Sequence, residues 1–174
     1  MASELRVDKI IPTTGVPTGG GGGIIQVIFG STTTQASQTN SATTQNTLTD
    51  TNLTATITPK FSTSKILVQA FQHYEFTNGT NTQMQGNLYI CDGNNNILDG
   101  KVLADYDQLR VKEQYAYAGV HPMQLLHSPN TTSAFTYKVR MNFYYVAAGT
   151  GVMYAQIANR TNCVSTITLM EISA

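Results

Sequence analysis

The chain is poor in charge. Only 11% of its 174 residues are Asp, Glu, Lys or Arg, and ten basic residues balance ten acidic ones. Capture of nucleic acid or of an anionic membrane surface needs a basic excess, so we expect neither partner. The polar content consists instead of Thr, Ser, Asn and Gln, which keep a surface wet without making its contacts sensitive to salt.

Long apolar runs and cysteines are also scarce. The longest apolar runs are far below the roughly 20 residues of a spanning helix, so no transmembrane segment is expected. The first ten residues, MASELRVDKI, are charged and lack the apolar stretch of a secretory signal. Without a secretory route, reduced and buried thiols are favoured for Cys91 and Cys163, although a disulfide between them stays open.

The sequence contains only weak indications of a metal-binding site. The three histidines, His73, His121 and His127, are too few and too scattered for a zinc site, and a structural role is favoured for His73. Asp92, Asn94 and Asn96 begin like a calcium-binding EF-hand loop. However, Ile97 stands where that loop needs Gly, and Leu103 stands where it needs Glu. A hairpin turn is therefore the favoured interpretation.

Catalytic signatures are also missing. Serine never occurs in a G-x-S-x-G motif, and the glycines at 19–23 are not followed by the Lys of a phosphate-binding loop. Asp105 and Asp107 would share a face of an extended segment, as paired glycosidase carboxylates do, but a solvated charged loop is favoured. We expect neither an enzyme nor a cofactor.

Tyrosine is the one abundant aromatic residue, with nine copies against no Trp. Tyr106, Tyr115 and Tyr117 lie near the charged middle of the chain, where aromatic faces with a polar tip suit sugar rings and protein partners. The favoured alternative is that most tyrosines fill a sandwich and place their hydroxyls at its rim.

The sequence divides into three parts. In residues 3–11, SELRVDKII, apolar and charged residues alternate over a segment too short to bury its own apolar face. Two prolines and five consecutive glycines then interrupt any regular element. We predict an anchoring segment at 1–18, a glycine joint at 19–23 and a β-domain at 24–174. The residues expected to dock in the anchor are Leu5, Val7, Ile10 and Ile11.

The rest of the chain has the pattern of short strands. In LTATIT, Leu53, Ala55 and Ile57 alternate with threonines, and residues 135–145 alternate in the same way. Eight to ten such strands with turn signals, and no convincing helix, predict an antiparallel β-sandwich or jelly roll. Residues 31–52 are expected to form a long loop or a wandering edge strand with contact potential, and 99–113 a helical turn or a loop.

The last two predicted strands are apolar on both faces. A two-layer sandwich buries only one face of each sheet, so the other face needs a cover. A subunit interface would supply it, and we therefore predict a homo-oligomer. The residues assigned to this interface are Val152, Met153, Ile167, Leu169 and Met170.

Several stretches together resemble small virion structural, tail-fibre-like proteins of tailed phages of cyanobacterial and marine hosts. They are SELRVDKIIP with the glycine joint, ITPKFSTSKILV, SPNTTSAFTYKVR and the terminal STITLMEI. The resemblance implies a trimeric sandwich head of the C1q and tumour-necrosis-factor type, in a virion assembled in the bacterial cytoplasm. It further implies an appendage that contacts host-surface polysaccharide, or alternatively a capsid decoration protein that binds nothing on the host.

Overall fold

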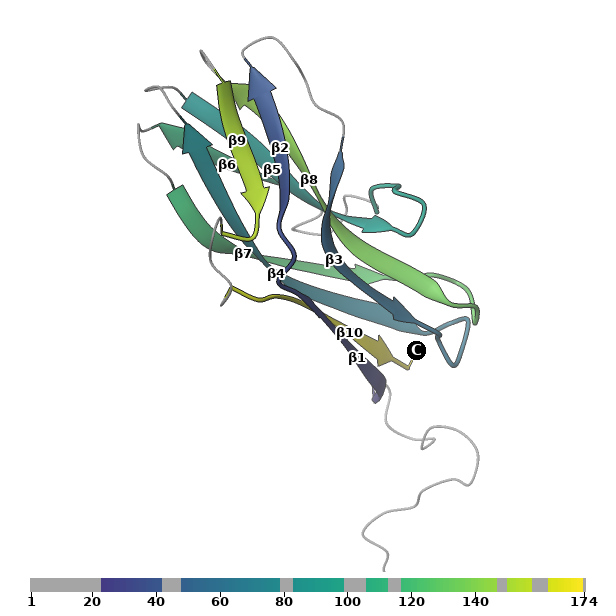
Figure 1. Cartoon of the computed structure of the whole chain (residues 1–174). Coiled ribbons are helices and arrows are strands. Elements are labelled where there is room, and N and C mark those ends of the chain that lie inside the picture. Colours follow the sequence, from purple (N-terminus) through teal and green to yellow (C-terminus); the bar gives the residue numbers. More distant parts are fainter. Residues whose placement is uncertain are drawn as a thin grey trace, which may run out of the picture.

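A computed structural model describes most of the chain. It covers residues 23–41, 48–78, 83–98, 106–112, 117–146, 150–157 and 163–173. Within these ranges the regular elements are ten β-strands (Figure 1). None of the described residues belongs to a helix that is long and apolar enough to cross a membrane. The predicted anchor at 1–18, with Leu5, Val7, Ile10 and Ile11, lies outside the described residues, as do glycines 19–22 of the joint.

The strands form two antiparallel sheets. Sheet A contains β1 (Ile24–Thr32), β2 (Ala36–Ser41), β4 (Lys65–Asn78), β7 (Tyr117–His127), β9 (Thr150–Ala155) and β10 (Ser165–Ile172). Sheet B contains β3 (Thr49–Ile57), β5 (Gln83–Asp92), β6 (Tyr106–Lys112) and β8 (Phe135–Val146), in the order β3-β8-β5-β6. Every strand pairing is antiparallel.

Sheet A consists of four rows, two of which are interrupted. β7 pairs with one edge of β4, while the other edge pairs first with β10 and then with β9. β9 and β10 therefore form one row, and β1 and β2, which pair with them, form the next. The eight rows can be numbered in chain order, with β1 and β2 together as row 1, β3 to β8 as rows 2 to 7, and β9 and β10 together as row 8. In these numbers the order is 1-8-3-6 in sheet A and 2-7-4-5 in sheet B. This is the strand order of a jelly roll, so the predicted fold class is confirmed.

Alternating sequence explains the core between the sheets. Leu53, Ala55 and Ile57 of β3 are buried, and the threonines between them are exposed, as predicted. Sheet A contributes Ile66, Val68, Ala70, Phe76, Met153, Ile167 and Leu169, and sheet B contributes Leu88, Ile90, Tyr137, Val139, Met141 and Phe143. The period of two places one apolar face of each strand between the layers.

Two expectations for the less regular stretches need correction. Tyr106–Lys112 is strand β6, paired with β5, rather than the helical turn or loop expected within 99–113. For residues 31–52 the two alternatives were a long loop and an edge strand. Ala36–Ser41 is an edge strand, and β3 begins within the same stretch, at Thr49. Residues 42–47 and 99–105, which include Asp105, are outside the described residues.

Candidate functional site

In sheet A, β9 and β10 form one row beside β4, and hydrogen bonds that involve side chains bridge the interruption between them. β4 changes partner near His73, whose backbone N–H donates to Ser165 Oγ at 2.9 Å. The His73 carbonyl accepts from the Gln156 N–H at 2.9 Å. Gln72 Nε2 also donates to Ser165 Oγ, at 3.0 Å. These bonds satisfy the β4 backbone where it changes ladder partner, so the sheet continues across the break.

One surface of sheet A points away from sheet B and is largely apolar. We call it the outer face; it contains Val27, Phe29, Ser31, Leu67, Gln69, Phe71, His73, Val120, Pro122, Gln124, Leu126, Thr166, Thr168 and Met170. In register, Val27, Met170, Leu67 and Leu126 make a row of four apolar side chains across four strands. Val27 is 55% exposed and Phe29 is 65% exposed. Lys65 and Glu75 of β4 lie on the same side of the sheet and bound this set, and between them it contains no Asp, Glu, Lys or Arg, so it is a candidate assembly surface.

The residues predicted for the oligomer interface are divided between two environments. Met153, Ile167 and Leu169 are fully buried in the core between the sheets. Because their own chain covers them, they cannot contact a neighbouring subunit in this fold, and their assignment is corrected. Val152 and Met170 are half-buried and alternate with the core residues, so they lie on the opposite side of sheet A.

The histidines and the Asp92 turn, for which the sequence favoured roles other than metal binding, have protein partners in the structure or lie apart. No group of three His, Cys, Asp or Glu residues in the described ranges could hold a metal ion. His127 Nδ1 lies 2.9 Å from the Tyr137 hydroxyl, and burial lowers the pKa of His127 below its usual value. The side chain of Asp92 accepts hydrogen bonds from the N–H groups of Asn94 and Asn96, both at 2.9 Å. This is the turn that the sequence predicted in place of a calcium loop.

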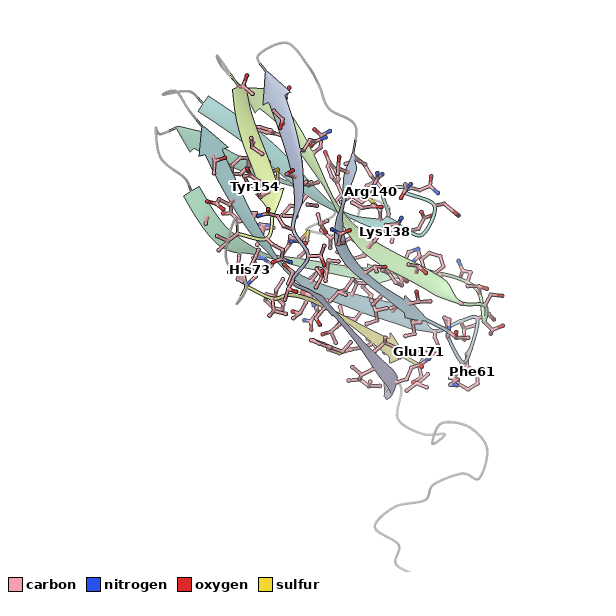
Figure 2. All side chains as sticks on the ribbon, in the orientation of Figure 1. Phe61, His73, Lys138, Arg140, Tyr154 and Glu171 are labelled. Carbon is pink, nitrogen blue, oxygen red and sulfur yellow. The ribbon has the colours of Figure 1, made fainter. Side chains whose placement is uncertain are left out.

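A buried carboxylate that the sequence did not reveal fastens one end of the sandwich. Glu171 Oε1 accepts from the N–H of Lys60 at 2.7 Å, and its Oε2 accepts from Gln26 Nε2 at 2.5 Å (Figure 2). Burial raises the pKa of the Glu171 carboxyl, but its hydrogen bonds outweigh that effect and hold the pKa below the usual value. The group therefore connects β1 and β10 to the loop between β3 and β4.

A β-bulge shapes the outside of sheet B. Asp50 pairs with Arg140 and Thr54 with Lys138, so three residues of β3 lie opposite the single residue Val139. The buried Thr51 hydroxyl donates to the Val139 carbonyl at 2.8 Å. Beside the bulge is a depression of about 330 Å³ lined by Asp50, Asn52, Leu53, Thr54, Gly93, Thr136, Lys138 and Val139. The sequence did not reveal this depression, for which the only signal was an Asn within the Thr-rich stretch TDTNLT.

Comparison with known proteins identifies no family. No protein-family model matches the chain, and no curated protein matches its sequence. The structure is similar to that of the infectious bursal disease virus Gx strain, with 10% identity, 93% of this chain covered and a TM-score of 0.41. It is also similar to the VP2 subviral particle of the same virus, with 10% identity, 93% coverage and a TM-score of 0.37. This chain spans 45% and 46% of those two chains, less than half of each.

Proposed function

We propose that this chain is a virion structural protein of a tailed phage, with a jelly-roll head that assembles with further copies of itself. The supporting observation is the outer face of sheet A, which is four strands wide, carries an exposed apolar row across all four, and is free of charged side chains between Lys65 and Glu75. A face of this kind needs a cover that is equally free of charge. The class of particle is proposed from the resemblance of several sequence stretches to phage tail-fibre-like proteins.

The occupant we assign to the outer face is a second copy of the chain. Strands are about 4.8 Å apart and same-face residues about 6.8 Å apart, so four strands by four rows cover roughly 500 Å². Val164, which is 43% exposed just before β10, lengthens the face at its rim. A standard interface takes about 800 Å² from each partner, so the face supplies a large part of one. Covering a stretch that carries no charged side chain also avoids desolvating an ion.

Residues 1–18 are the second element of the proposal. They precede an edge strand, since β1 pairs only with β10 in the sheet order, and Ile24 at its start is 59% exposed. A segment attached there can dock on another protein without disturbing the core. We assign this segment to the particle and the sandwich to the exposed head. A closed trimer then places three equivalent segments around one axis.

The alternatives of host contact and capsid decoration use the same assembly. We favour host contact because the polar outer surface of sheet B lies on the opposite side of the sandwich from the proposed interface (Figure 1). It therefore stays accessible after the outer face of sheet A is covered. The Tyr137 hydroxyl beside His127 Nδ1 is buried within the sandwich, and we propose no catalytic function.

Electron microscopy of virions tests this function. Antibody raised against the recombinant chain is expected to label purified particles of the phage that encodes it, on a tail appendage for a host-contact protein. Label spread over the capsid would favour decoration. Particles that carry no label, when the same antibody detects the chain in infected cells, would contradict a virion protein of either kind.

A further inference from the structure

The bulge in β3 places one amide in an unusual position. Asn52 has a φ of 64°, in the left-handed region that Asn tolerates better than most residues. Its side chain is exposed and lines the depression on sheet B. Within the described part of the chain the Asn52 amide makes no hydrogen bond. Two donors and one acceptor are therefore available to a ligand.

The charges around the depression compensate one another. Asp50 accepts from Arg140 Nε at 2.8 Å and lies 3.7 Å from Lys138 Nζ (Figure 2). Lys138 also interacts electrostatically with the Asp92 carboxylate. Two cations thus face two carboxylates. A phosphate or sulfate would meet these carboxylates, and a metal cation would meet the Lys and the Arg, so a ligand without net charge fits best.

The remaining lining includes the hydroxyl groups of Thr54 and Thr136. Thr54 Oγ1 donates to the Tyr137 carbonyl at 3.0 Å and keeps its acceptor sites, and the hydroxyls of Thr136 and Thr56 lie 2.7 Å apart. The apolar members Leu53 and Val139 turn their side chains into the core. The depression offers hydrogen-bonding groups beside a comparable area of apolar surface, a combination that suits a sugar ring. At about 330 Å³ it is at the small end of ligand pockets, which span roughly 300–1,000 Å³.

From this geometry we infer that the depression between β3 and β8 is a binding site for a neutral saccharide. Ring hydroxyls are both donors and acceptors, which matches the Asn52 amide, the Thr54 hydroxyl and the exposed Asp50 carboxylate. A shallow polar site binds weakly by itself, and several copies in one assembly raise the avidity. The inference rests on the proposed host contact, for which it names the ligand class and the residues.

Binding of the full-length chain to immobilised bacterial polysaccharides tests the site. The array should hold neutral O-antigen and capsular polysaccharides beside acidic ones, and the best neutral glycan is then titrated in solution. Asn52→Gly removes the amide and keeps a backbone that favours left-handed φ, so we expect affinity to fall about tenfold, as for one lost hydrogen bond. Thr54→Val should weaken binding as well.

Asn130→Gly is the matched control, since Asn130 is also exposed with a φ of 52° but is outside the depression. It should bind like the parent chain, and thermal unfolding should show that all variants are folded. If no neutral glycan binds, or if Asn52→Gly binds as tightly as the parent chain, the inference is wrong. Virions that carry the protein would in that case leave the proposed function intact, whereas unlabelled virions would contradict that function whatever the glycan result.

Discussion

Gly30 of β1 lies directly against the Thr54 carbonyl of β3. A Cβ atom added to Gly30 would be 2.5 Å from that oxygen and 3.0 Å from a methyl group of Ile167. The two sheets therefore approach each other closely at a point where only a glycine backbone fits. This contact joins the edge row of sheet A to the edge strand of sheet B and closes one side of the sandwich.

Gly30→Ala should consequently destabilise the fold. The carbonyl belongs to a paired strand and cannot move aside, so the strands must separate, at a cost of about 1–3 kcal/mol in the free energy of unfolding. Urea unfolding followed by circular dichroism measures it. Gly23→Ala is the control, because nothing lies within 4 Å of a Cβ at Gly23. Equal stability of the two variants would contradict the close approach of the sheets.

Glu171 should make stability depend on acidic pH. Its folded pKa is lowered, so the stabilisation is present above the unfolded value near pH 4.3 and is lost as pH falls through the folded pKa. Glu171→Gln is expected to unfold at lower urea concentration at pH 7 and to lose less stability between pH 5 and pH 2 than the parent chain. Urea midpoints at several pH values measure this. Parallel pH profiles for the two proteins would exclude the role given to Glu171.

The two thiols should differ in reactivity. Both cysteines are free; Cys91 is buried and Cys163 is half-buried. Burial raises the pKa of the Cys91 thiol to about 11, so at pH 8 few molecules hold the reactive thiolate. A disulfide-exchange reagent should label one thiol rapidly in the native protein and both in urea, and Cys163→Ser should remove the rapid phase. Rapid labelling of Cys91 in the folded protein would contradict its burial.

The sequence predicted the fold because alternation reports which residues share a face. Leu53, Ala55 and Ile57 were assigned to the core on that basis, and the structure confirms it. Alternation does not report which of two apolar faces points inward. For β10 both Ile167 and Met170 were assigned to an interface, and only packing against sheet B buries the first and leaves the second outside.

The sequence alone could not predict features that depend on how distant strands align in the folded sheets. The bulge at Asn52 exists because Asp50 and Thr54 pair with residues only two positions apart on β8. The break near His73 likewise requires Ser165 and Gln156, which are distant from it in sequence. A polar residue in a strand pattern looks the same whether it faces solvent, closes a break or lines a depression, so the candidate saccharide site needed the structure.

Assembly through the outer face depends most on its exposed aromatic and aliphatic side chains. Phe71, at 49% exposure, lies on this face, whereas Phe61, at 43% exposure, lies in the loop between β3 and β4. Phe71→Lys introduces a charge that association would bury, and Phe61→Lys does not. The first substitution should dissociate the assembly and the second should leave it unchanged.

Sedimentation velocity of the full-length chain at micromolar concentration is the most direct test of this assembly. We predict that the parent chain and Phe61→Lys sediment as the same oligomer, a trimer, and that Phe71→Lys sediments as a folded monomer. A parent chain that remains monomeric, or an oligomer that Phe71→Lys does not weaken, would contradict the assignment of the outer face of sheet A as the interface between copies.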